Sequence, residues 1–335
     1  MQRQRPSAAE VTSAAAEAVS RFAANLDALI SAGARIGIAV SGGPDSIALL
    51  LLANAARPSG IEAATVDHGM RPESAGEAGM VAELCSRLNV PHRTLLADWP
   101  KPPEANVQAA ARAMRYRLIN EWAIERGLAA VATGHHADDQ AETLLMRLLR
   151  GAGVGGMGGT RARRALSEDV QLVRPLLGWR KSELEALVRK AGVTPADDPS
   201  NRDPRHDRSR IRQLLGAADW LDPVRLAASA AALQDADEAL DWALAPLIAA
   251  RIHREGEVLT VDPAELPREL KRRLLLAGFA ELGASVPRGA ELMRAVDLLE
   301  AGQSASLSGL TLRGGATWRL SVAPPRRGKI VDGTQ

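Results

Sequence analysis

Cysteine and aromatic residues are scarce in this sequence. Its 335 residues include one cysteine, Cys85, and only 3% aromatic residues. A single cysteine excludes a disulfide framework within the chain, a cysteine-ligated zinc site and an iron–sulfur cluster. So few aromatic residues also exclude an extended stacking platform for single-stranded nucleic acid. The core must therefore be built mainly from aliphatic side chains, which the 46% of hydrophobic residues can supply.

Long apolar runs are missing as well. No run reaches the roughly 18 residues that a membrane-spanning helix needs. The first residues of the sequence lack the apolar stretch of a secretory signal. We therefore expect a cytoplasmic protein that has no membrane partner. The oligomeric state stays open, with a homodimer as one option.

Positive charge is concentrated in one segment, although the formal net charge of the whole sequence is only +2. Residues 161–212 carry 13 Lys and Arg against 8 Asp and Glu, while the sequence on either side is slightly negative. A segment of this kind suits a polyanionic partner. A solvated basic surface is the alternative interpretation.

Short apolar runs alternate with helix-like segments over the first half of the sequence. The apolar runs are residues 35–40, 61–66, 90–96 and 128–133, and the helix-like segments are residues 45–56, 74–88, 106–126 and 138–150. Buried strands separated by helices predict a doubly wound parallel α/β sheet, with ligands at the carboxyl ends of its strands. A further apolar run at 170–177 and a helix at 181–191 complete this pattern.

Two domains are expected from the length and from changes in composition. Residues 1–215 form the α/β domain, which begins with a helix inside residues 1–33. Residues 192–212 are rich in Pro, Asp and Arg and predict a long surface loop. Residues 216–325 form a smaller, mainly helical domain that also contains short strands, and residues 326–335 form a disordered tail.

A phosphate-binding loop is expected directly after the first strand. We call this segment the phosphate loop; its residues are Ser41, Gly42, Gly43, Pro44, Asp45 and Ser46. Its glycines let backbone N–H groups approach phosphate oxygens, and the following helix offers its positive end. Asp45 would repel a bare phosphate, so its presence predicts a bridging Mg²⁺. The alternative is an ordinary helix cap.

A second cluster follows the fourth strand. His135 and His136 precede Asp138, Asp139 and Glu142 at the start of a helix. Carboxylates placed opposite a phosphate loop can hold Mg²⁺, so we expect Asp138 and Asp45 to share the metal. The alternative is that the acids only stabilise the positive end of the helix.

Arginine and glycine mark two further segments. Arg112 and Arg115 lie three residues apart on a predicted helix and could contact a phosphate together. Residues 151–156 fit a dinucleotide-binding glycine pattern, but they follow a helix where that pattern follows a strand. We therefore predict that residues 151–159 form a mobile loop beside the active site.

Several of these segments resemble one enzyme family. The phosphate loop resembles the SGGxDS loop of the N-type ATP pyrophosphatases, or PP-loop enzymes. Residues 66–74, 134–143 and 150–153 are similar to segments of the tRNA(Ile)-lysidine synthetases, and the resemblance extends over residues 35–215. It implies an adenine nucleotide alpha hydrolase-like fold. It also implies catalytic roles for Asp45, Asp138, Glu142 and Arg115, and ATP contacts by the phosphate loop, Asp67, His68, Arg112 and His135.

The resemblance implies a ligase that uses ATP and Mg²⁺. Its expected substrates are L-lysine and tRNA(Ile): lysine is joined to C2 of an anticodon cytidine through an adenylylated intermediate, releasing AMP and pyrophosphate. Thiolating relatives are excluded because they need more cysteines than this chain has. The alternatives are an adenylylating ligase acting on another tRNA base or a small metabolite, and a non-catalytic ATP-binding module.

The expected tRNA contacts lie in the basic segment. They are Arg205, Arg208, Arg210 and Arg212, in a stretch that resembles the family pattern D-x-S-N followed by R-N-x-x-R. Ser209 stands where the family commonly has Asn.

Overall fold

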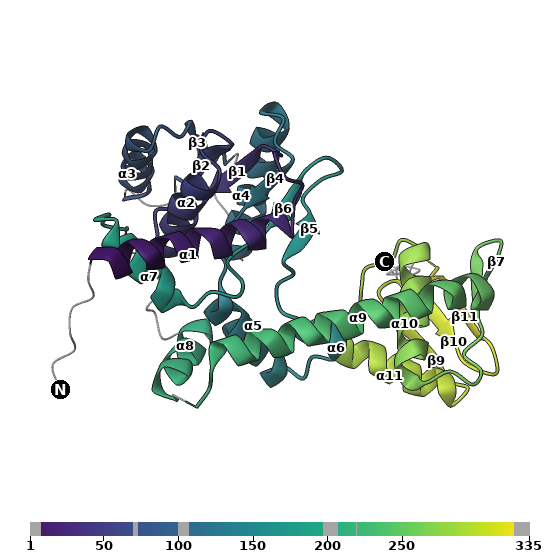
Figure 1. Ribbon diagram of the computed structural model, residues 1–335. Helices are drawn as coiled ribbons and strands as arrows, with labels where there is room; N and C mark the ends of the chain where they lie inside the picture. The colour runs from purple at the N-terminus through teal and green to yellow at the C-terminus, as the bar shows by residue number, and fades with distance from the viewer. Residues whose placement is uncertain (1–7, 70–72, 100–106, 197–206, 219, 325–335) are drawn as a thin grey trace, which may run out of the picture. The chain divides into compact units, whose positions relative to one another are not determined.

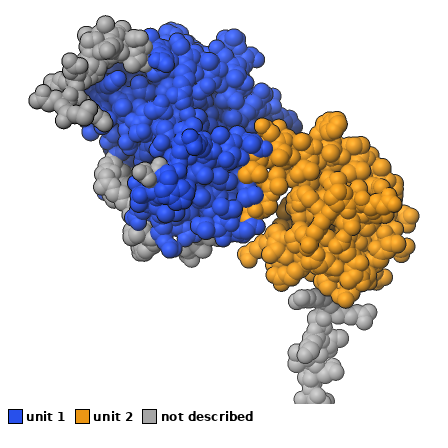
Figure 2. All heavy atoms as spheres, turned by 60° about the horizontal axis from the view of Figure 1, so that its bottom comes forward, with its two compact units in different colours: residues 1–151, 157–232 blue, residues 152–156, 233–335 orange. Residues whose placement is uncertain are grey.

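The computed structural model describes residues 8–69, 73–99, 107–196, 207–218 and 220–324 (Figure 1). The chain divides into two compact units, coloured separately in Figure 2. Unit 1 comprises residues 1–151 and 157–232, and unit 2 comprises residues 152–156 and 233–335. The domain boundary expected at residue 215 falls inside a helix of unit 1.

Unit 1 contains a six-stranded sheet in the order β3-β2-β1-β4-β6-β5. All neighbouring strands are parallel except β5 and β6, which are antiparallel. The strands are β1 (Ile36–Ala39), β2 (Ile61–Asp67), β3 (His92–Leu96), β4 (Ala130–Ala132), β5 (Arg163–Ala165) and β6 (Gln171–Val173). The chain order reverses beside β1, so a ligand site is expected where β1 and β4 end.

Helices cover both faces of this sheet. Alternate strand residues point to opposite faces, and the apolar side chains on each face pack against helices. Ile36 and Ile38 of β1 pack into a core with the first two helices, while Ala39 packs on the other side with Trp122. The helices of unit 1 before the basic segment are α1 (Ala8–Asp27), α2 (Pro44–Ala56), α3 (Glu73–Arg87), α4 (Val107–Glu125) and α5 (Ala137–Leu149). Helix α7 (Lys181–Lys190) follows β6 and packs on α2. The predicted doubly wound fold is confirmed.

The prediction of a surface loop over residues 192–212 is wrong for the last residues of that range. Residues 197–206 lie outside the described part of the chain, but Asp207 begins helix α8 (Asp207–Ala217). Ser209 and Ile211 of this helix are buried. The helix has few apolar residues, so hydrophobic periodicity does not reveal it in the sequence. Its arginines contact acidic residues of α5, which a sequence pattern does not show.

Unit 2 combines helices with an antiparallel sheet in the order β7-β8-β11-β10-β9. Its strands are β7 (Ile252–Glu255), β8 (Val258–Val261), β9 (Ser304–Leu307), β10 (Leu310–Arg313) and β11 (Trp318–Val322). Its helices are the short α6 (Val154–Met157), most of α9 (Pro223–Arg251), α10 (Arg268–Glu281) and α11 (Gly289–Glu300). Trp318 and Phe279 are fully buried in its core, and the strands expected among these helices are present. In the part of the chain that the structure describes, no helix is both long and apolar enough to cross a membrane.

Candidate active site

The phosphate loop joins the end of β1 to the start of α2, as its sequence predicts. Gly42 adopts a φ of 88°, a conformation that favours glycine. Ser46 Oγ donates to the Gly43 carbonyl (2.9 Å) and accepts the N–H of Ser41 (3.1 Å). These bonds close the loop over the first turn of α2, whose N-terminal N–H groups favour an anion.

Gly134 lets the end of β4 lie against this loop. A Cβ at Gly134 would come within 2.9 Å of the Asp45 carbonyl oxygen and 3.1 Å of the Ser46 nitrogen. Both atoms belong to backbone and cannot move aside cheaply. The close approach therefore brings His135 and His136 next to the phosphate loop.

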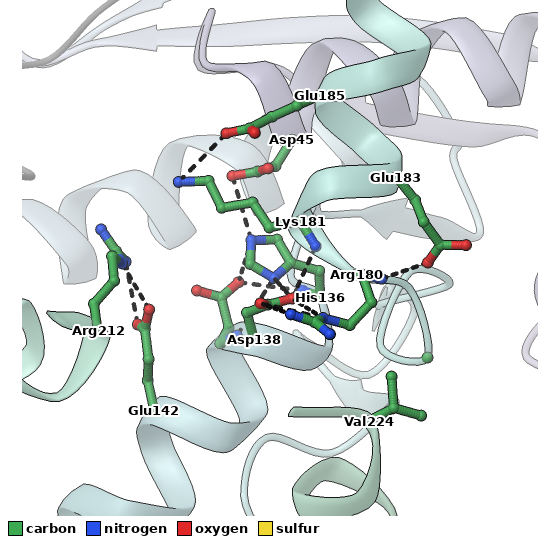
Figure 3. Close-up of polar contacts among 12 residues, drawn as sticks. Asp45, His136, Asp138, Glu142, Arg180, Lys181, Glu183, Glu185, Arg212 and Val224 are labelled. Atoms are coloured by element: carbon green, nitrogen blue, oxygen red, sulfur yellow. Dashed lines mark hydrogen bonds and ion pairs between the residues drawn. The ribbon is translucent and has the colours of Figure 1, made fainter. Parts of the chain in front are cut away.

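His136 connects two acidic residues across this junction. Figure 3 shows its contact with Asp45. It is 3% exposed, and its Nε2 lies 3.5 Å from Asp45 Oδ2 and 3.6 Å from Asp139 Oδ2. Burial disfavours the charged ring, but the surrounding carboxylates outweigh that effect and raise the pKa of His136. Nδ1 accepts the N–H of Asp139 (3.3 Å), so the proton shared with the carboxylates lies on Nε2.

Asp139 is a pocket residue that the sequence did not single out for a role. Its carboxylate also caps α5 by accepting the N–H of His136 (3.2 Å), and it binds Arg208 (3.1 Å). Burial alone would raise its pKa, but His136 and Arg208 lower it. Asp139 is therefore a half-buried carboxylate that stays ionised beside the phosphate loop.

Asp138 occupies a different place from the one expected for a metal ligand. Its carboxylate accepts the backbone N–H of Lys181 (2.8 Å) and contacts the guanidinium of Arg180 at 3.3–3.4 Å. Asp138 thus fixes the beginning of α7 to α5, as Figure 3 shows. Its oxygens face α7 in this structure, and the expectation that it shares a cation with Asp45 stays a prediction.

Glu142 lies behind the pocket, where it holds two arginines of α8. It is 2% exposed and accepts from Arg208 Nε (2.6 Å) and from Arg212 Nε (2.7 Å) and Nη2 (3.1 Å). Arg208 and Arg212, which were expected to contact tRNA, line the pocket, and their contact with tRNA stays a prediction. Of the other two expected tRNA contacts, Arg210 is exposed on α8 and Arg205 lies outside the described residues.

The pocket itself has a volume of about 830 Å³ and belongs to unit 1. Its polar lining includes many residues of the predicted site: Ser41, Gly43, Asp45, Ser46, His68, Arg112, Arg115, His135, Arg208 and Arg212. It also includes four residues without a predicted role there: His136, Asp139, Lys181 and Glu185. Lys181 is a cation there that the sequence analysis did not single out. Residues 151–159, the glycine-rich segment, are absent from the described lining, and Ala152–Gly156 belongs to unit 2.

The other end of the pocket is formed after β2. Asp67 accepts the N–H of Gly69 (2.9 Å) and the hydroxyl of Ser74 (2.5 Å), and these bonds lower the pKa of Asp67. Arg115 contacts His68 Nε2 from α4 at 3.2 Å. The Asp67 bonds therefore shape the turn that carries His68, and the predicted residues of both segments meet here.

His135 is the uncharged histidine of the pair. Burial and nearby arginines lower its pKa to about 4 against the opposing effect of Asp139, and its Nδ1 lies 3.0 Å from Thr133 Oγ1. A neutral imidazole can hydrogen-bond a nucleotide without adding charge.

The acidic residues fit a cation that takes most of its ligands from a substrate. Asp45 Oδ1 is buried and has no hydrogen-bond partner among the described residues. Within the described ranges, no group of three or more His, Cys, Asp or Glu is arranged to hold a metal by itself. Mg²⁺ is characteristically bound by one or two carboxylates together with substrate phosphates, so Asp45 beside the phosphate loop fits this ion.

Comparison with known proteins agrees with the geometry of unit 1. The PP-loop domain family matches residues 12–218. A protein of Zymomonas mobilis subsp. mobilis named tRNA(Ile)-lysidine synthase is 45% identical, over 89% of this chain and 91% of its own length. A protein of the same name from Novosphingobium aromaticivorans is 47% identical, over 92% of this chain and 95% of its own length.

One solved structure shares the fold at low identity. The U34-tRNA thiolase NcsA from Methanococcus maripaludis matches with a TM-score of 0.55 and 18% identity, over 66% of this chain and 78% of its own. This likeness concerns the fold alone.

Proposed function

The chain belongs to the tRNA(Ile)-lysidine synthase family, and from that premise we propose that its pocket joins L-lysine to C2 of a cytidine in the anticodon of tRNA(Ile). The observation that carries this proposal is the pairing of the phosphate loop with the half-buried carboxylates Asp45 and Asp139 in one pocket. The chain is an ATP-using ligase. A non-catalytic ATP-binding module is disfavoured because binding alone does not need an ionised carboxylate beside phosphates.

The first step transfers AMP to the base. The cytidine O2 attacks the α-phosphorus of ATP, a new P–O bond forms, and pyrophosphate leaves. The phosphate loop and the first turn of α2 bind the phosphate oxygens. Asp45, assisted by Asp139, would hold a Mg²⁺ ion, which when bound supplies positive charge to the phosphates. Arg112 and Arg115 line the same pocket and add positive charge toward the nucleotide.

The second step replaces AMP by lysine. An amine of lysine attacks C2, the C2–O bond breaks, AMP leaves with the oxygen, and the amine loses a proton. A diamino acid needs partners of both signs, and the pocket provides them: Arg208, Arg212 and Lys181 for its carboxylate, and Glu185 for its ammonium group. Holding both ends of lysine at fixed positions raises the effective concentration of the amine.

The test is incorporation of labelled L-lysine into a tRNA(Ile) transcript, measured together with pyrophosphate release. The parent enzyme should give both, and Asp45→Asn should reduce both by at least about a hundredfold because the isosteric amide cannot neutralise a cation. Asp297→Asn is the matched control, since Asp297 is an exposed carboxylate of unit 2 paired with Arg268. That variant should match the parent.

Two results would contradict the proposal. Pyrophosphate release by Asp45→Asn at the parent's rate under saturating Mg²⁺ would remove Asp45 from the reaction. Release by the parent without any RNA, in the presence of a small metabolite, would favour the alternative ligase.

A further inference from the structure

Three arginines occupy one free edge of the unit 1 sheet. We call Arg161, Arg163 and Arg164 the edge arginines; all three are exposed. Strand β5, which carries two of them, is the last strand of the sheet and pairs only with β6. None of these residues belongs to the site described above.

The start of this edge is held rigidly. Arg174, which follows β6, is 3% exposed and donates from its guanidinium to the carbonyl of Arg161. Its backbone N–H donates to the carbonyl of Ala162 (2.9 Å). The edge arginines therefore project from a fixed backbone rather than from a flexible loop.

Strand register brings this edge level with the active site. Ala132 of β4 pairs with Ile38 on one side and with Val173 on the other. Val173 in turn pairs with Arg163. Arg163 of β5 thus lies level with the carboxyl ends of β1 and β4, the end of the sheet at which the phosphate loop begins.

The chain's single tyrosine connects the edge to the pocket. The guanidinium carbon of Arg164 lies 4.8 Å from the centre of the Tyr116 ring, and that of Arg112 lies 4.9 Å from the same centre. Tyr116 and Arg112 both line the ATP pocket, whereas Arg164 is on β5. Two like charges on one ring are held there by cation–π attraction, so a change at Arg164 is felt by Arg112.

We propose that the edge arginines bind the sugar–phosphate backbone of the tRNA beside the reacting cytidine, and that the Arg164–Tyr116 stack positions Arg112 when the RNA is bound. The inference rests on the proposed function, which supplies an RNA substrate. Arg163 and Arg164 extend to opposite faces of β5, because their strand partners Val173 and Leu172 lie in different cores. A phosphate backbone that follows this exposed strand, level with the phosphate loop, meets a cation on either face. Arginines on an edge strand also discourage pairing with another strand, but that role does not explain the contact with a pocket tyrosine.

The experiment measures the affinity of a tRNA(Ile) transcript as a function of salt concentration, with ATP affinity measured separately. Arg163→Ala and Arg164→Ala should each weaken tRNA binding and reduce the slope of log affinity against log salt by about one. ATP affinity should not change with Arg163→Ala. Arg313→Ala is the matched control, because Arg313 is an exposed arginine on a strand of unit 2; it should keep the parent's slope.

A charge-preserving variant tests the stack. Arg164→Lys should keep the parent's salt slope, but its tRNA-dependent pyrophosphate release at saturating tRNA should fall about two- to fivefold, because lysine lacks the planar group that stacks on the ring. A rate equal to the parent's would overturn the positioning role of the stack.

If both alanine variants show the parent's slope of log tRNA affinity against log salt, the edge arginines do not contact the RNA and the proposal is wrong. These failures can be told apart from failure of the proposed function, since the parent enzyme is first shown to incorporate lysine into the same transcript.

Discussion

Gly134 shows how much of the active site depends on a missing side chain. Its Cα faces the backbone of Asp45 and Ser46, and this contact sets the distance between β4 and the phosphate loop. His136 depends on that distance, because its Nε2 reaches Asp45 across the same junction. The absence of a side chain at Gly134 therefore allows the contact between His136 and Asp45.

We expect Gly134→Ala to lower ATP affinity by about tenfold or more, since overpacking against fixed backbone costs roughly 1–3 kcal/mol. Titration calorimetry with ATP measures the effect. Gly79→Ala is the control: nothing lies within 4 Å of its added Cβ, and alanine in helix α3 should stabilise the protein by roughly 0.5–1 kcal/mol. Equal ATP affinity in the two variants would show that the junction tolerates a side chain.

At the scale of elements, helix α8 is attached to α5 through ion pairs. Glu142 accepts from both Arg208 and Arg212, and Asp139 accepts from Arg208 as well. A buried carboxylate between two guanidinium groups avoids the cost of an unpaired charge. Because the same arginines line the pocket, the attachment of α8 also completes the site.

We predict that Glu142→Gln loosens α8. Loss of the charge should destabilise the protein by about 1–2 kcal/mol, less than a fully buried pair would, because the arginine side chains are partly exposed. Hydrogen exchange of α8 amides should accelerate, and lysine incorporation should fall. Glu121→Gln, which breaks the exposed pair with Arg117, should cost less than about 0.5 kcal/mol and leave α8 unchanged. Unaltered exchange of α8 in Glu142→Gln would contradict the attachment.

At the scale of the whole molecule, each unit has its own core and its own buried charges. Unit 2 is organised around Arg273, which is 6% exposed and binds Asp237, Asp241 and Glu269. Gly155 belongs to this unit, and its Cα lies so close to Asp237 that a Cβ would come within 2.7 Å of Oδ1. Residues 152–156 of the glycine-rich segment therefore pack within unit 2.

We expect Arg273→Met to destabilise unit 2 by about 3–5 kcal/mol, because three carboxylates lose their common partner. Hydrogen exchange of peptides from β8 and β11 should accelerate strongly. ATP affinity should stay at the parent's value, since all the described residues that line the pocket belong to unit 1. Arg268→Met removes an exposed pair with Asp297 and should have little effect. A loss of ATP affinity in Arg273→Met would show that the units do not act separately.

Three features could be predicted from the sequence alone: the alternating α/β pattern, the phosphate loop and the two histidines after β4. These features are local: buried strands are continuous apolar runs, and the phosphate loop needs its glycines at fixed positions. The extent of α8 and the neighbours of its arginines were decided only by the tertiary structure. Glu142 and Arg208 are 66 residues apart in the chain, and their ion pair forms only where two helices pack together. The same holds for Asp138 and Asp139, adjacent acids that the fold turns toward α7 and toward the phosphate loop, because local charge patterns do not state which partner each carboxylate will meet.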